Sequence, residues 1–230
     1  MRPTDSHSSR AQALDHLLDD RYSCRAYLSN PVPVETIRTM FTMAQKTASW
    51  CNTQPWQVVV TSGGATERFA RFLTEHARSH PPRSDFEMPA TYRGVYDVRR
   101  RESGFALYES LGIAREDRQA RAEQAAENFS FFGAPHVAVV TTDRDQAVYG
   151  AIDCGGYVAT LLLAARSLGI ATVAQAAIAM YSDAVRDHLG LPEDRMVVCA
   201  VSFGYADEEH PANGFRTTRA TFDEAVELRD

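Results

Sequence analysis

The stretch A-S-W-C-N-T-Q-P-W at residues 48–56 joins a predicted helix to a predicted strand, and it constrains which fold the rest of the chain can adopt. The residues before it place apolar side chains at helical spacing, which predicts one amphipathic helix: Ile37, Met40, Phe41, Ala44 and Ala48. The run W-Q-V-V-V-T at residues 56–61 has the β-branched composition of a strand. The stretch therefore occupies a helix-to-strand loop, where binding residues are common.

The side chains of this loop suit recognition of a polar ring. The amides of Asn52 and Gln54 combine donors and acceptors that match a uracil-like edge, such as the pyrimidine ring of a flavin. Pro55 moves Gln54 out of the helical region and stiffens the entry to the strand. A purely structural interpretation also stands, in which the segment forms a cap and turn and Trp56 enters the core.

Two pairs of arginines could hold a phosphate. Neither G-x-G-x-x-G nor G-x-x-x-x-G-K-[ST] occurs, so a bound nucleotide would need side chains for its phosphate. In an extended segment Arg21, Ser23 and Arg25 would share one face, and the arginine fork matches phosphate geometry. Arg216 and Arg219 form the second pair. Each pair taken alone could equally be solvated surface charge.

The chain predicts one α+β domain. Residues 1–10 are polar and are expected to form a disordered tail, residues 11–230 the domain, and residues 83–132 an insert that covers the site. Strands are predicted at 56–61, 137–142 and 196–203, with helices between them. The apolar stretch 157–165 is read as a buried core helix, too short to span a bilayer and interrupted by Arg166.

Composition excludes several classes of protein. The net charge of −6 argues against non-specific nucleic-acid binding, which depends on a basic surface. The four cysteines form no clustered pair, which argues against a zinc site and fits a reducing cytoplasm. Single histidines are more often structural than catalytic, and this applies to six of the seven here: His16, His76, His80, His136, His188 and His210.

In their order and spacing, these motifs resemble the FMN-dependent nitroreductase family, over about residues 20–226. The segments that carry the resemblance are R-x-S-x-R at 21–25, P-V-P at 31–33, A-S-x-x-N-x-Q-P-W at 48–56, N-F-x-F-F-G-A-P at 128–135, G-A-I-D-x-G at 150–155, G-L-P at 190–192 and R-x-x-R at 216–219. The resemblance implies a mixed central sheet flanked by helices in an intertwined homodimer.

The resemblance also implies which residues would hold FMN. Arg21, Tyr22, Ser23 and Arg25 would meet the phosphate and ribityl chain, with Arg216 and Arg219 closing on the phosphate. Ser49, Asn52 and Gln54 would come from the partner subunit. Gln175 and Ala176 fall where the family places a backbone contact near flavin N5, although the T-V-A-Q-A sequence at 172–176 departs from the glycine-containing form of that turn.

The implied activity is hydride transfer from NADH or NADPH through the flavin to nitroaromatics or quinones by a ping-pong mechanism. No side-chain acid, base or metal ligand is predicted, because the cofactor carries the chemistry. Arg99, Arg100 and Arg101 could favour a carboxylated substrate. The H-P-A-N tail at 210–213 and the long insert resemble the nitrobenzoate-reducing branch of the family. The alternative is a non-catalytic dimer that binds flavin or another aromatic ligand on the same scaffold. Dehalogenation and oxygen-dependent flavin cleavage rank lower, since no motif selects them.

Overall fold

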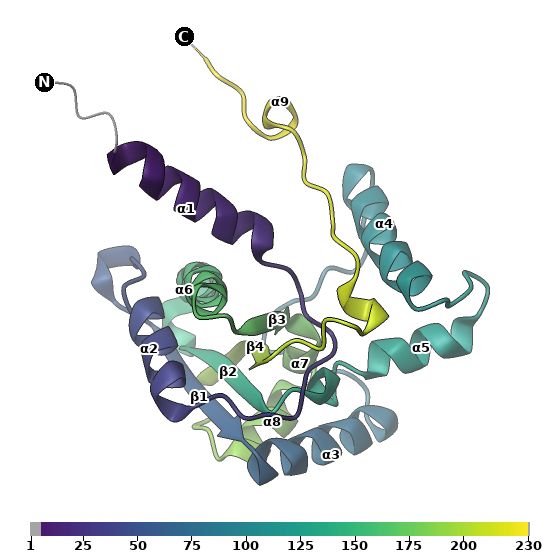
Figure 1. Cartoon of the computed structure of the whole chain (residues 1–230). Coiled ribbons are helices and arrows are strands. Elements are labelled where there is room, and N and C mark those ends of the chain that lie inside the picture. Colours follow the sequence, from purple (N-terminus) through teal and green to yellow (C-terminus); the bar gives the residue numbers. More distant parts are fainter. Residues whose placement is uncertain (1–5, 230) are drawn as a thin grey trace, which may run out of the picture.

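The computed structural model describes residues 6–229, which form a small sheet enclosed by helices (Figure 1). The α-helices are α1 (Ser6–Asp20), α2 (Val34–Ala44), α3 (Gly64–Ser79), α4 (Val95–Ser110), α5 (Arg118–Ala126), α6 (Ala147–Ser167), α7 (Ala176–Ala179), α8 (Ser182–Leu189) and α9 (Phe222–Ala225). The strands are β1 (Trp56–Ser62), β2 (His136–Asp143), β3 (Ala171–Gln175) and β4 (Arg195–Gly204). The short 3-10 turns are η1 (Trp50–Asn52), η2 (Phe131–Gly133), η3 (Arg144–Gln146) and η4 (Pro211–Asn213).

The four strands form one sheet in the order β1-β2-β4-β3. All three strand pairs are antiparallel, and a register shift between Val140 and Thr141 interrupts the β2–β4 ladder. The sheet formed by the described strands is therefore antiparallel, and the expectation of a mixed sheet was wrong. Parallel pairing in the described residues is confined to isolated bridges, one between Ser23 and Thr172 and one between Arg83 and Tyr181.

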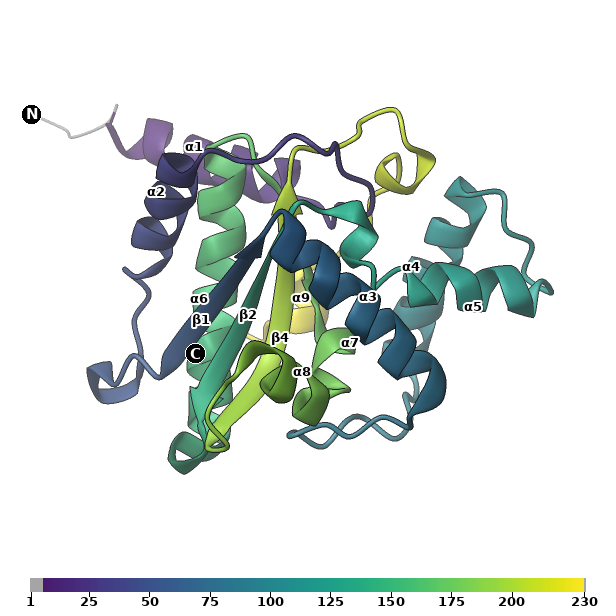
Figure 2. The same cartoon turned by 90° about the horizontal axis from the view of Figure 1, so that it is seen from below.

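Strand β2 is buried on both faces, so its apolar residues serve two cores. Ala138 and Val140 pack toward α2 and α6, whereas Val137 and Val139 pack toward α3, α7 and α8. Figures 1 and 2 show these two helical layers on opposite sides of the sheet. The α+β layer architecture predicted from the sequence is confirmed.

Two elements differ from the sequence-based expectation. Strand β3 was not predicted, because its short A-T-V-A-Q sequence has no alternation of large apolar residues; its pairing with β4 defines it. Helices were expected between the strands at 56–61 and 137–142, and one of them is the 16-residue helix α4, which also includes Arg99–Arg101, outside the residues expected to be helical. Helix α4 buries none of its residues fully, so its sequence has no apolar stripe from which the helix could be predicted.

The N-terminal segment and the apolar helix also differ from what the sequence predicted. The predicted disordered tail covered residues 1–10, but residues 6–10 are helical in α1, and residues 1–5 lie outside the described residues. The apolar stretch lies in a longer helical segment, Arg144–Ser167, which is long and apolar enough to cross a membrane by length and composition only, a test that core helices of soluble proteins also meet. Of its most apolar 18-residue window, 33% is buried.

His136 joins the start of α2 to the sheet. Its Nε2 accepts a hydrogen bond from the backbone N–H of Val32 over 2.9 Å, and its Nδ1 lies 2.7 Å from Ser62 Oγ. The ring stacks on Phe203 with centroids 5.0 Å apart. Burial lowers the pKa of His136 below its ordinary value. Because Nε2 must stay unprotonated to accept from Val32, the native state favours the neutral ring.

We expect this contact to make stability depend on pH. A histidine with a lowered native pKa contributes stability that is fully present above about pH 6.5 and is lost as pH falls through its native pKa. The free energy of unfolding, measured with urea at pH 7.5 and pH 5.5, should therefore fall on acidification. In H136Q the amide oxygen can still accept from Val32 but does not titrate, so the fall should be smaller. An equal fall in both proteins would contradict this role for His136.

Candidate functional site

The segment that carries the first arginine pair is held in extended form against β3. The backbone N–H of Cys24 donates to the carbonyl of Thr172 over 3.0 Å, next to the parallel bridge between Ser23 and Thr172. Arg21, Ser23 and Arg25 line the same pocket, together with Tyr22 between them. The structure therefore brings these three residues together, as their spacing suggested.

The C-terminal arginines reach the same place because Asn213 ties the two chain ends together. Asn213 is buried, and its Oδ1 accepts from the backbone N–H of Arg25 over 2.7 Å. Its Nδ2 donates to the carbonyls of Ala26 and Asp207 over 2.9 and 2.8 Å. The guanidinium of Arg216, three residues on, lies over the ring of Tyr22 at 3.8 Å from the centroid.

The resulting pocket of about 500 Å³ is rich in positive charge. Its lining includes Arg21, Tyr22, Ser23, Arg25, Arg216, Thr217 and Arg219. Within the described part of the chain, none of the four arginines forms an ion pair with a carboxylate, although the exposed Asp19 also lines the pocket. Burial, followed by the charge of Arg219, lowers the pKa of Arg21, and burial lowers that of Arg25. Four arginines that are not ion-paired with a carboxylate make this pocket a candidate site for an anion.

Ser49, Asn52 and Gln54 lie together in the loop around η1, away from the arginine pocket. The backbone N–H of Gln54 donates to Ser49 Oγ over 2.9 Å, and Gln54 Nε2 donates to Asn52 Oδ1 over 3.1 Å. Figures 1 and 2 place this loop, between α2 and β1, on the other side of α6 from the Arg21–Arg25 segment. One chain therefore does not bring the amide loop and the arginines into one site.

Gln175 and Ala176 mark the end of β3 and the start of α7. The side chain of Gln175 is buried and already engaged, since its Nε2 donates to the carbonyl of Asn128 over 2.9 Å and its Oε1 accepts from Ser202 Oγ. Ala176 is exposed. This leaves the backbone at Gln175 and Ala176, rather than the Gln175 side chain, as the group able to meet a ligand.

The arginines of the predicted cover lie on α4, and each has its own neighbour. Arg99 lies 3.9 Å from Glu224, Arg101 lies 3.9 Å from Asp97, and the guanidinium of Arg100 sits over the ring of Tyr92. Arg99 also lines a cavity of about 720 Å³ that shares Ser103, Arg216, Thr217 and Arg219 with the arginine pocket. Of the three, Arg99 is therefore placed next to the candidate site.

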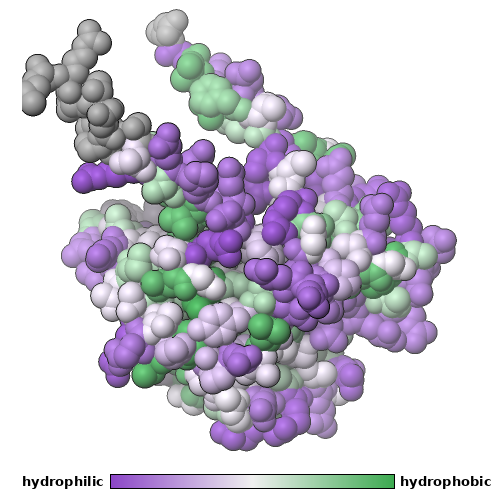
Figure 3. Space-filling view, in the orientation of Figure 1, coloured by the Kyte–Doolittle hydropathy of each residue, from purple (hydrophilic) through white to green (hydrophobic). Residues whose placement is uncertain are grey.

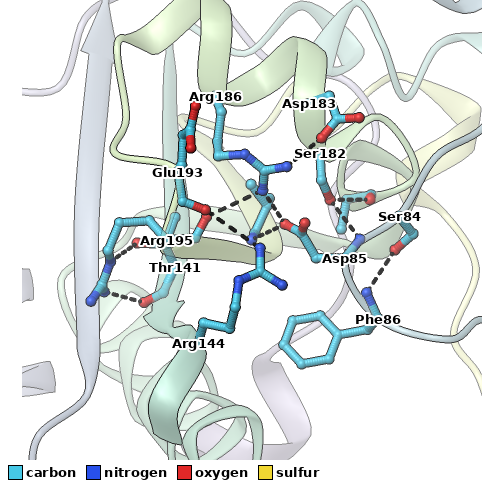
Figure 4. Close-up of polar contacts among 12 residues, drawn as sticks. Ser84, Asp85, Phe86, Thr141, Arg144, Ser182, Asp183, Arg186, Glu193 and Arg195 are labelled. Carbon is cyan, nitrogen blue, oxygen red and sulfur yellow. Dashed lines mark hydrogen bonds and ion pairs between the residues drawn. The ribbon is translucent and has the colours of Figure 1, made fainter. Parts of the chain in front are cut away.

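The start of the cover is anchored to the sheet through Asp85 (Figure 4). Its Oδ2 accepts from the backbone N–H of Val197 over 2.8 Å and from Arg186, which also pairs with Asp183. The side chains of Asp85 and Arg186 are 7% and 11% exposed. A buried pair of this kind is costly to break, so it fixes where the cover leaves the body.

Sequence reasoning missed residues that build the pocket without carrying its charge. Asn213 lies in a polar tail, where nothing distinguishes a buried asparagine from a solvated one. Phe215, whose ring lies 5.6 Å from the Arg25 guanidinium, and Ser103 of α4 also line the pocket. No feature of the sequence therefore pointed to this junction.

Comparison with known proteins identifies related chains along almost the full length. The model of the family described as "Nitroreductase family" matches residues 18–205. The chain is 39% identical to nitroreductase NfnB of Mycolicibacterium smegmatis, over 97% of this chain and 96% of that protein. It is 34% identical to a 4-nitrobenzoate reductase of Nocardioides sp., over 94% and 89%. The crystal structure of FMN-dependent NfnB from Mycobacterium smegmatis in complex with NADPH superposes with a TM-score of 0.91 at 38% identity, covering 96% of this chain and 99% of that one.

We predict that Asn213 sets the shape of the arginine pocket. N213A would leave the N–H of Arg25 without an acceptor, whereas the carbonyls of Ala26 and Asp207 would each lose one donor and keep the backbone N–H of Asp207 and His210, respectively. A buried polar group left unpaired costs about 1–3 kcal/mol, so urea denaturation should show a loss of about that size in the free energy of unfolding. N30A, which removes an exposed asparagine, is the control and should change little. A loss in N213A no larger than that in N30A would overturn this assignment.

Proposed function

The chain belongs to the nitroreductase family, and from this we propose that it is an FMN-dependent oxidoreductase that uses NADH or NADPH to reduce nitroaromatic compounds or quinones. The observation that carries the proposal is the arginine pocket, which offers four guanidinium groups without a carboxylate partner in the described chain. The full-length similarity to reductases places this pocket in an enzyme scaffold.

The residues present fit FMN. Its phosphate supplies the counter-charge that Arg21, Arg25, Arg216 and Arg219 lack, and the arginine fork binds phosphate oxygens in pairs. Ser23 adds a hydroxyl on the same face of the extended segment. Asn52 and Gln54 present amide donors and acceptors that suit the pyrimidine edge of the ring system. The two groups of residues lie apart in one chain, so this fit needs the amide loop of a second copy.

We propose that the second copy is the partner in an intertwined homodimer. Helix α6 leaves Val148 and Ile152 about 60% exposed on an apolar helix that the sheet covers only on one side. The C-terminal arm extends away from the body with Phe222, Val226 and Leu228 exposed, and Figure 3 shows apolar groups along it. Apolar surface of this extent favours association with another chain.

The protein's own residues would bind and orient the reactants. When bound, FMN supplies the two-electron hydride chemistry that lets the nicotinamide donor and the acceptor react in turn, a ping-pong order. The arginines fix the phosphate end, and the amide loop fixes the ring end. No side chain of the described site is placed as an acid or base, so we propose that water supplies the protons. We also propose that the reaction takes place in the cytoplasm, since the four cysteines are all free.

The first test is an anaerobic absorbance spectrum of the purified protein, before and after NADPH or NADH and then 4-nitrobenzoate. Flavin bands that bleach with the donor and recover with the acceptor are expected. A yellow protein that no donor bleaches would favour a non-catalytic flavin-binding protein on the same scaffold. A protein that binds no flavin after incubation with FMN would contradict the proposal.

The arginine pocket gives a sharper prediction. R25A removes a partly buried cation and should weaken FMN binding by about tenfold or more, since a charge-assisted hydrogen bond is worth ~1.5–3 kcal/mol. Fluorescence titration with FMN measures the effect. R71A, which removes an exposed arginine on α3, is the matched control and should bind FMN like the unaltered protein. Equal affinity for FMN in R25A and R71A would show that Arg25 does not bind the phosphate.

We further propose that Arg99 favours carboxylated nitroaromatics, because it is the arginine of α4 that borders the site. Its exposed pair with Glu224 holds the charge only weakly. R99Q should lower kcat/KM for 4-nitrobenzoate relative to nitrobenzene by about fivefold, equivalent to ~1 kcal/mol. R101Q on the same helix is the control and should leave the ratio unchanged. An unchanged ratio of the two kcat/KM values in R99Q would contradict a role for Arg99 in carboxylate preference.

A further inference from the structure

The loop that carries Ser49, Asn52 and Gln54 has an unfavourable backbone. Cys51, Asn52 and Gln54 have φ angles of 50°, 56° and 47°, in the left-handed region that side chains with a Cβ disfavour. A conformation of this kind persists only where the surroundings determine it, and such segments gather at functional sites. The question is which contacts impose it.

Asp153 supplies the contact at the start of the loop. It lies on α6, 103 residues from Trp50 in sequence, and both of its carboxylate oxygens accept from the backbone N–H of Trp50, over 3.2 and 3.1 Å. Trp50 is the first residue of η1, so this carboxylate satisfies an N–H that the short helix itself cannot pair. Asp153 forms no ion pair in residues 6–229, which leaves this hydrogen bond as its contact with the loop.

Other residues hold the two ends of the loop against helix α6 and the sheet. Tyr149, one turn before Asp153 on α6, packs its ring 4.1 Å from that of Trp50. At the other end, the buried Arg195 donates to the carbonyl of Pro55 over 3.1 Å and to the backbone and hydroxyl of Thr141 on β2. Figure 4 shows Arg195 directed at Thr141. The loop is thus fixed to α6 at Trp50 and to the sheet at Pro55.

We propose that Asp153 is a positioning residue for flavin binding: it holds the Trp50 N–H and so keeps the amides of Asn52 and Gln54 in the arrangement that meets the ring edge. This inference rests on the proposed function for its ligand. Asp153 does not touch the flavin in this scheme; it acts through the backbone of η1. Both Asp153 and the loop belong to the surface that the second copy would complete.

The test compares D153A and D153N with the unaltered protein, and D145A is the matched control because Asp145 is exposed at the start of the same helical segment. D153A removes the acceptor and should weaken FMN binding by about tenfold or more. D153N keeps one acceptor oxygen and should recover most of that affinity. D145A should bind FMN like the unaltered protein.

A second measurement reports on the loop without any flavin. Amide hydrogen exchange over Trp50–Gln54 in the flavin-free protein should be about tenfold faster in D153A, and close to the unaltered rate in D153N and D145A. Unchanged exchange in D153A, or a loss of FMN affinity in D153N as large as that in D153A, would overturn the inference. If the unaltered protein binds no FMN, the proposed function fails, and the exchange rates alone still decide whether Asp153 positions the loop.

Discussion

The structure depends on bringing the two ends of the chain together so that four arginines face one pocket. Asn213 makes this junction by bonding to the backbone of Arg25 and Ala26. Burial of Arg21 and Arg25 lowers their pKa, which is the mark of cations deprived of part of their hydration. A protein that keeps such charges without carboxylate partners must recover the lost solvation from a ligand, and phosphate is the anion that arginine binds best. The sheet, the edge of β3 and the returning C-terminal segment all serve to hold this arrangement.

The sequence predicted those parts of the site in which spacing translates directly into geometry. Alternation along an extended segment placed Arg21, Ser23 and Arg25 on one face, and Pro55 excluded Gln54 from the right-handed helical region, as its φ of 47° confirms. Strand β3 was not predicted because its pairing with β4, rather than its own composition, makes it a strand. The extent of helix α4 was not predicted, because the helix buries no residue fully and so shows no apolar stripe. Asn213 could not be found from sequence, since its burial depends on contacts 187 and 188 residues away.

The phosphate end and the ring end of the proposed flavin site have different physical requirements. The phosphate end needs charge, which the chain supplies from flexible arginines guided by a well-bonded backbone. The ring end needs amides in a fixed arrangement, which the chain supplies from a strained loop anchored by Asp153 and Arg195. Because α6 separates the two halves within one chain, association of two copies would complete two sites at once (Figure 1). The exposed apolar face of α6 and the extended C-terminal arm supply the surface for that association.

The central claim is that each site takes its arginines from one chain and its amides from the other. The most direct test mixes two chains, one carrying R25A and one carrying N52A, and counts tight FMN sites by titration of the isolated hybrid. In the hybrid, one site would combine both substitutions and the other would have intact arginines from one chain and an intact amide loop from the other. The account predicts one tight FMN site per hybrid dimer, although each parent dimer has none. No tight site in the hybrid would show that arginines and amides act within the same chain and would contradict the account.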